Sequence, residues 1–109
     1  MTIHPSEEHV EVVVHGVTIA KSDGAMRLEE TGLPPRYYLP REDVRMDLLR
    51  PTTFHTTCPF KGEASYWSLN LDGEVLDGLM WSYEAPNAGV EAIKGLVCFS
   101  PERVDPLVS

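Results

Sequence analysis

Asp72-Gly73 is the strongest fold signal in this chain, because the dipeptide separates two runs rich in apolar residues. Aspartate followed by glycine accepts the positive φ angles of a two-residue β-turn. The pattern predicts a hairpin whose strands cover residues 64–71 and 75–83. Side chains alternate between the two faces of each strand, so aromatic residues of both strands can meet across the hairpin.

A second hairpin is expected over residues 10–20, where His15-Gly16 joins two β-branched runs. The other expected elements are strands over 36–39 and 96–99, a strand or helical turn over 25–30, a short helix over 41–49 and a helical turn over 90–94. Strands outnumber helices, so we expect a mainly β fold. It would consist of antiparallel sheets curled into a small barrel or sandwich, with two short helices as connections.

The chain has the length and composition of one globular domain, which we place at residues 1–109. No apolar run approaches the ~18 residues of a membrane span, and the N-terminus lacks a signal-peptide pattern. We therefore expect a cytoplasmic protein without a membrane partner. Seventeen acidic and nine basic residues give a net charge of −8, which argues against binding to nucleic acid. Cys58 and Cys98 are expected to be free thiols.

The segment from Thr56 to Trp67 places a thiol, an amine, a carboxylate and a phenol in one turn and one strand. Pro59 and Gly62 restrict the backbone that presents these groups, as expected for a binding site. Lys61 suits an anionic ligand, because its ammonium group and free backbone N–H groups both attract negative charge. The alternative is a surface lysine, or one paired with Glu63.

Cys58 is a candidate nucleophile, because an ammonium group such as that of Lys61 favours the reactive thiolate form. His55 could act as its base or orient it. Against this, cysteine often only fills space in a core, and His55 could lie in solvent. His55 and Cys58 also have the spacing of two metal ligands, but a structural zinc site needs four. Cys98 has no second ligand near it in the sequence, so no metal site is predicted.

Four aromatic residues, Tyr38, Tyr66, Trp81 and Tyr83, could line a ligand pocket with flat rings and polar edges. The same residues could instead form the core between sheets. Arg36 would join the pocket if the strand over 36–39 runs beside the turn that carries Lys61.

Four motifs occur in order along the chain: Arg36–Val44, Thr57–Tyr66, Trp81–Pro86, and Ile93–Gly95 with Phe99. In this order and spacing they resemble the domain-of-unknown-function 427 family, which is also labelled nucleotidyltransferase-like. The resemblance covers essentially the whole chain. It implies a bacterial single-domain protein with a β-tent-like arrangement of antiparallel sheets and no assigned activity.

The label nucleotidyltransferase-like has no motif behind it in this sequence. The chain contains neither a GxxxxGK phosphate loop nor a close pair of acids on a strand that would hold two magnesium ions. The chain also reads Phe99-Ser100 where the family often has Phe-Tyr, so no role of that tyrosine carries over.

Three hypotheses of function follow from these patterns. The first is binding of a small anionic metabolite in a pocket formed by Cys58, Lys61, Glu63 and Tyr66, faced by Arg36, Tyr38, Trp81 and Tyr83. The second is an enzyme in which Cys58 acts as a thiol nucleophile with help from Lys61. The third is a structural module without a ligand, whose exposed sheet edge pairs with a partner strand or forms a homodimer. None of the three predicts a cofactor.

Overall fold

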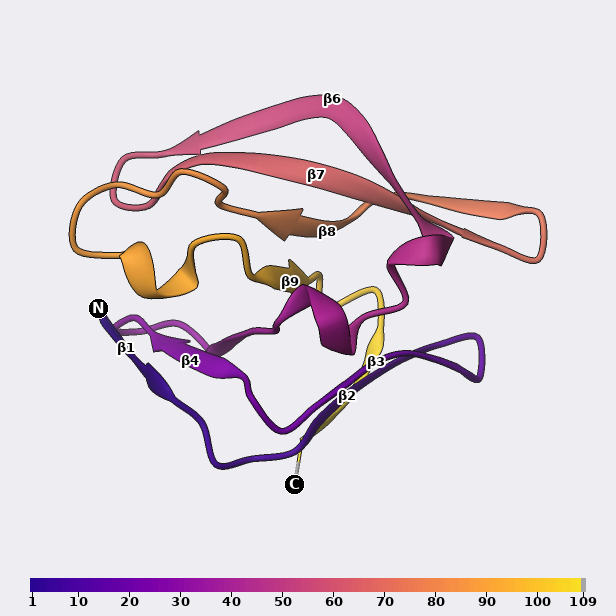
Figure 1. The fold of residues 1–109 in the computed structure, drawn as a ribbon, viewed down its shortest axis with the longest axis horizontal. Helices are drawn as coiled ribbons and strands as arrows, with labels where there is room; N and C mark the ends of the chain where they lie inside the picture. Colours follow the sequence, from indigo (N-terminus) through magenta and orange to yellow (C-terminus); the bar gives the residue numbers. More distant parts are fainter. Residues whose placement is uncertain (109) are drawn as a thin grey trace.

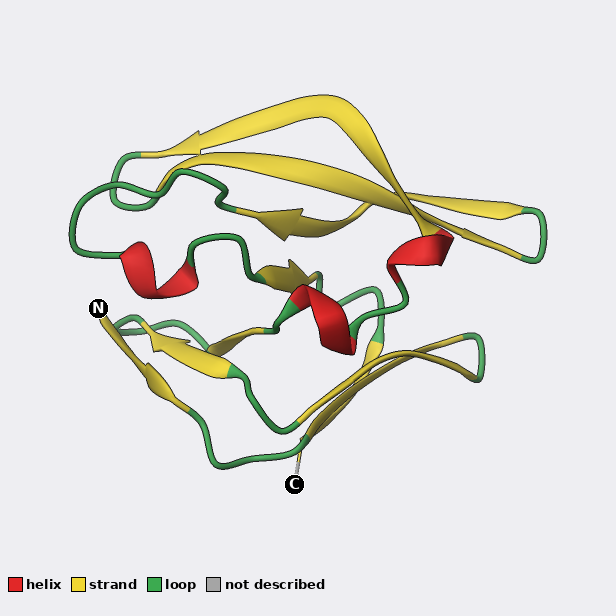
Figure 2. Cartoon of the chain, in the orientation of Figure 1, coloured by secondary structure: helices red, strands yellow, loops and turns green. Residues whose placement is uncertain are grey.

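The computed structural model describes residues 1–108, and its largest sheet has four antiparallel strands (Figures 1 and 2). This sheet occupies the upper part of Figure 1. Its strands, in spatial order, are β6 (Leu49–Cys58), β7 (Gly62–Leu71), β8 (Glu74–Ser82) and β9 (Val97–Phe99).

Two smaller sheets lie below the four-stranded sheet in Figure 1. One contains β1 (Thr2–Pro5), β4 (Met26–Glu29) and β5 (Arg36–Tyr38) in that order. The other contains β10 (Asp105–Val108), β2 (Val10–Val14) and β3 (Val17–Ser22). All pairings in these sheets are antiparallel and all three sheets are open. The predicted mainly β class is confirmed.

Both predicted hairpins are present, and each turns through two residues. Asp72 and Gly73 connect β7 to β8 with φ angles of 50° and 78°. His15 and Gly16 connect β2 to β3 with φ angles of 49° and 77°. Positive φ at both turn positions gives the backbone twist that matches two paired strands. The two dipeptides therefore define these turns.

The helix expected over 41–49 is wrong. Two short 3-10 segments, η1 (Arg41–Asp43) and η2 (Met46–Leu48), occupy this region, and the backbone between them is extended at Val44. Val44 forms an isolated antiparallel bridge with Ala20 of β3. This tertiary backbone pairing interrupts the helical hydrogen-bond pattern that the apolar spacing had indicated.

The helical turn expected over 90–94 is present as the 3-10 segment η3 (Glu91–Ile93). Residues 1–108 contain no α-helix, so the connections are short turns rather than helices (Figure 2). A search of the described residues found no helix with the length and hydropathy needed to cross a membrane.

The sequence patterns did not predict β6. This strand lies at one edge of the four-stranded sheet, and most of its residues are exposed. A strand without a buried face shows no apolar alternation in its sequence. Its pairing with β7 is also irregular between Pro51 and His55, where β6 bends away. The short outer strands β1 and β10 were missed as well.

Side-chain alternation along β7 and β8 divides the interior into two apolar clusters. Trp67 pairs with Met80, and both pack in the larger cluster beneath the four-stranded sheet. Their sequence neighbours Tyr66 and Trp81 pair with each other and contact the smaller cluster, which consists of Leu28, Tyr38, Ala64, Tyr83, Val90, Ile93 and Cys98. Because successive residues face opposite sides, one hairpin contributes to both clusters.

A backbone contact between Leu39 and Val97 joins the sheet of β5 to the sheet of β9. The Leu39 N–H donates to the Val97 carbonyl at 2.8 Å, and the Val97 N–H donates back at 2.9 Å. The contact brings Tyr38 beside Trp81, whose indole Nε1–H donates to the Tyr38 hydroxyl at 3.3 Å. Residues distant in the sequence therefore share one side of the smaller cluster.

Candidate functional site

A cavity of about 280 Å³ lies over the smaller apolar cluster. Residues of β5, β7 and β8 form its walls, together with residues from the loops after β4, β6 and β8. The lining residues are Glu30, Leu33, Arg36, Tyr38, Lys61, Tyr66, Trp81 and Tyr83. Its volume is close to the lower end of the range for small-molecule sites, about 300–1,000 Å³. We call it the aromatic pocket.

Most of the residues singled out from the sequence meet at the aromatic pocket. They are Arg36, Tyr38, Lys61, Tyr66, Trp81 and Tyr83. Cys58 lies next to it, with its Sγ 3.8 Å from the Nζ of Lys61. Glu63 does not belong to this group: its side chain is 67% exposed and faces His55. Glu63 follows the buried Gly62 in β7 and therefore points to the opposite side of the strand.

Lys61 is paired with Glu30 rather than with Glu63. Its Nζ lies 2.8 Å from a carboxylate oxygen of Glu30, and the two side chains are only 12% and 27% exposed. Sequence analysis missed both Glu30 and the exposed Leu33 as lining residues. For Glu30 a signal existed: it stands two positions after Leu28, which is buried in the smaller cluster, so alternation points it to the same side.

Arg36 has a buried guanidinium nitrogen, Nη1, for which the described residues offer no hydrogen-bond partner. Its Cζ lies 5.6 Å from the centre of the Trp81 ring, a cation–π contact. Buried polar atoms are nearly always hydrogen-bonded in folded proteins. Among the described residues, Arg36 therefore has unused hydrogen-bonding capacity, and its side chain lines the aromatic pocket.

Four aromatic rings surround the aromatic pocket in two tilted pairs. Tyr66 and Trp81 have ring centres 6.3 Å apart, and Tyr38 and Tyr83 have centres 6.4 Å apart. Burial raises the pKa of Tyr83 to about 12, and burial also raises the pKa of Tyr38. Both phenols consequently keep their protons at neutral pH and can donate hydrogen bonds.

Two hydrogen bonds from Asn87 stabilise the turn that carries Lys61. The Asn87 backbone N–H donates to the Lys61 carbonyl at 2.9 Å, and its side-chain amide donates to the Pro59 carbonyl at 3.3 Å. Gly62 has φ +108°, and a Cβ there would lie 3.2 Å from the Asn87 side-chain oxygen. Glycine is needed at this position for both its backbone angle and its small size.

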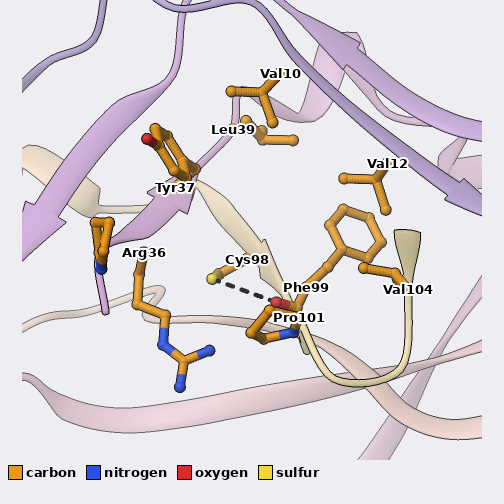
Figure 3. Close-up of a pocket in the computed structure, with 10 residues that line it drawn as sticks. Val10, Val12, Arg36, Tyr37, Leu39, Cys98, Phe99, Pro101 and Val104 are labelled. Carbon is orange, nitrogen blue, oxygen red and sulfur yellow. Dashed lines mark hydrogen bonds between the residues drawn. The ribbon is translucent and has the colours of Figure 1, made fainter. Parts of the chain in front are cut away.

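A second cavity of about 60 Å³ is also lined in part by Arg36 (Figure 3). Val10, Val12 and Leu39 form one wall, and the Arg36 guanidinium points away from them. Cys98 also lines it, with its Sγ donating to the Phe99 carbonyl at 3.8 Å. This cavity is much too small for an organic ligand. Burial raises the pKa of Cys98 to about 12, so the thiol is protonated and unreactive at neutral pH.

A third cavity of about 400 Å³ shares Tyr66 with the aromatic pocket and is also lined by Thr52 and Phe54 of β6. Its polar residues include Asp77, which accepts a hydrogen bond from Ser68, and Arg103, which donates to the Asp77 carbonyl. These groups are paired with each other. In residues 1–108, no three His, Cys, Asp or Glu side chains lie close enough together to hold a metal ion.

Comparison with known proteins identifies the family of the chain. A search of curated proteins found no match. The family model described as a domain of unknown function, DUF427, matches residues 2–109. This range includes every residue of the aromatic pocket and nearly the entire sequence. The chain therefore belongs to the DUF427 family, as the four ordered motifs had indicated.

Proposed function

We propose that this domain binds a small organic anion in the aromatic pocket, with Arg36 as the main contact. The observation that carries the proposal is the buried Arg36 Nη1 without a hydrogen-bond partner among the described residues. A buried charged donor left unpaired costs about 1–3 kcal/mol or more, which a ligand acceptor would recover. Carboxylate and phosphate oxygens are the acceptors that a guanidinium group binds best.

The other polar groups of the aromatic pocket support an acceptor-rich ligand. Within residues 1–108, the Tyr83 hydroxyl makes no hydrogen bond, and its raised pKa of about 12 keeps it a donor. The Tyr38 hydroxyl accepts from Trp81, which leaves its own proton available. Lys61 has further N–H groups beyond the one directed at Glu30. The pocket therefore offers several donors and a single anionic acceptor, Glu30.

Arg36→Gln is expected to weaken anion binding about tenfold or more, because a hydrogen bond to a charged group contributes about 1.5–3 kcal/mol. The measurement is a two-dimensional ¹⁵N NMR titration with acetate, malonate, inorganic phosphate and benzoate. Amide signals around residues 36–38, 61–62 and 81–83 should shift with at least one of these anions. The affinities of the parent and the variant then give the fold-change.

Arg50→Gln is the matched control, because it removes the same charge from β6 and leaves the aromatic pocket intact. Arg50 donates to the carbonyls of Asp47 and Leu49. The proposal predicts that this control binds the anions like the parent. Equal affinities in the parent and in both variants, or no shifts with any of the four anions, would contradict it.

Thiol chemistry at Cys58 is a second candidate, favoured by the 3.8 Å distance between its Sγ and the Lys61 Nζ. Glu30 competes with Cys58 for the Lys61 ammonium group, because a Glu30 carboxylate oxygen lies only 2.8 Å from the Lys61 Nζ. The candidate requires that Lys61→Met slow alkylation of Cys58 by iodoacetamide several-fold at neutral pH. Cys98 is buried and provides an internal unreactive thiol. Equal alkylation rates in the parent and Lys61→Met would eliminate thiol chemistry assisted by Lys61.

A further inference from the structure

The side chains of the aromatic pocket carry one net positive charge. Arg36 and Lys61 are cationic and Glu30 is anionic. Glu30 lies 2.8 Å from Lys61 and neutralises it, so Arg36 provides the net positive charge of the lining. Outside the lining, a hydrogen bond from its own backbone lowers the pKa of the exposed Glu102 carboxylate, and the charge of Arg36 contributes to this lowering. The chain as a whole carries −8, and this field disfavours a second negative charge on a ligand. The charge balance therefore fits a monoanion better than a dianion.

The walls of the aromatic pocket favour a flat ligand. Tyr66 and Trp81 form one pair of rings, and Tyr38 and Tyr83 form the other. Aromatic rings gain additional attraction from offset or edge-to-face contact with another ring, about 0.5–1.5 kcal/mol beyond the buried area. A saturated ring of the same size buries similar area but lacks this term.

The volume of the aromatic pocket limits the ligand to about one ring. The cavity of about 280 Å³ lies slightly below the range of about 300–1,000 Å³ typical of small-molecule sites. A six-membered aromatic ring with one carboxylate is a ligand from the small end of that class. A nucleotide has more than twice as many non-hydrogen atoms, so the size argues for a compact acid.

The position of Arg36 favours a planar acid group. Its guanidinium Cζ lies 5.6 Å from the centre of the Trp81 ring, and its buried Nη1 is free of partners among the described residues. A guanidinium group presents parallel N–H bonds that match the two oxygens of a carboxylate. A carboxylate bound there would leave the ring attached to it within reach of the neighbouring aromatic walls.

Building on the proposed function, we propose that the ligand is a planar aromatic monocarboxylate. Its carboxylate pairs with Arg36, and its ring contacts the rings of Trp81 and Tyr66. The Lys61–Glu30 pair sets the charge of the pocket, so it selects against phosphate esters and other dianions. The aromatic pocket thus selects ligands that have both a single negative charge and a planar ring.

Four probes of similar size separate these features: benzoate, cyclohexanecarboxylate, benzamide and phenyl phosphate. Benzoate is expected to bind about tenfold more tightly than benzamide, because benzamide is neutral and cannot form a charged pair with Arg36. It should also bind about threefold or more tightly than cyclohexanecarboxylate, because of ring contact. Phenyl phosphate, measured near pH 8 where it is a dianion, should bind more weakly than benzoate.

Glu30→Gln tests the role of the Lys61–Glu30 pair. The substitution removes the negative charge of Glu30 and so raises the net charge of the aromatic pocket by one unit. We expect this to shift the affinity ratio of phenyl phosphate to benzoate about tenfold toward phenyl phosphate. Glu29→Gln is the matched control. Glu29 is the preceding residue, is half exposed and pairs with Arg27 outside the pocket. The control should leave the ratio unchanged.

Several outcomes would overturn the proposal. Phenyl phosphate binding more tightly than benzoate in the parent would exclude selection for a monoanion. Equal binding of benzoate and cyclohexanecarboxylate would exclude selection for a flat ring. In both cases, loss of binding in Arg36→Gln would still support an anion site, and only the ligand class would be wrong. Absence of Arg36-dependent binding by all the probes and by the simple anions would overturn both proposals.

Discussion

Tyr38→Ala is expected to lower the free energy of unfolding by about 3–5 kcal/mol, the cost typical of removing a large buried aromatic side chain. Tyr38 is only 1% exposed and belongs to the smaller apolar cluster. Its ring packs against Tyr83 with a centre distance of 6.4 Å. Urea unfolding of the parent and the variant, with the slope m checked for constancy, measures the loss. A domain of this size has a total stability of about 5–15 kcal/mol, so the effect would be large.

Tyr38→Phe is the control that separates the ring from its hydroxyl. The ring remains in the core, and the variant loses the hydrogen bond from the Trp81 indole, with an expected cost of about 1 kcal/mol. In the same variant, any drop in anion affinity reports the hydroxyl as a ligand contact. A cost below about 1 kcal/mol for Tyr38→Ala would show that the ring contributes little to the core.

Stability is expected to fall steeply as the pH rises above about 9, because buried acidic groups keep their protons longer in the folded state. Burial raises the pKa of Cys98 from near 9 to about 12 and that of Tyr83 from near 10 to about 12. The unfolded chain releases these protons first, so stability that is complete below pH 9 is lost between pH 9 and 12. A thiol ionised only in the unfolded state contributes a slope of about 1.4 kcal/mol per pH unit, or about 3 kcal/mol between pH 9 and 11.

Cys98→Ala identifies the thiol contribution to this alkaline loss. The variant lacks the thiol, so its stability should decline less steeply between pH 9 and 10, whatever its stability at neutral pH. Above pH 10 both proteins should continue to lose stability, because the buried Tyr38 and Tyr83 also have raised pKa values. Urea unfolding at half-unit pH intervals gives the slopes. Parallel curves for the parent and the variant would contradict a buried, protonated Cys98.

The hairpin turns could be predicted from the sequence because their cause is local. His15-Gly16 and Asp72-Gly73 adopt positive φ angles that few other residue pairs accept. The apolar spacing over 41–49 was misleading, because the extended pairing of Val44 with Ala20 depends on β3, which is distant in the chain. Local patterns do not contain such a backbone contact.

The members of the aromatic pocket could also be predicted in large part, since reactive groups and rings stand out in the sequence. Arg36, Lys61 and Trp81 do line one cavity. The prediction was wrong about which carboxylate lies beside Lys61 in the pocket. Glu63 is close in sequence but lies on the outer side of β7, whereas Glu30, in the β4–β5 loop, forms the ion pair. Choosing between them required the sheet pairing that places β5 beside β9.

The sequence by itself determined the β-hairpins, the mainly β class and the family of this protein, because turn chemistry and ordered motifs are local properties of the chain. Only the tertiary structure decided that Arg36 has a buried nitrogen without a hydrogen-bond partner in the described part of the chain and that Glu30 neutralises Lys61. It also decided that Tyr38 belongs to the core and to the pocket wall at once. Burial and charge balance depend on which distant segments come together, and those pairings arise from sheet topology rather than from neighbouring residues.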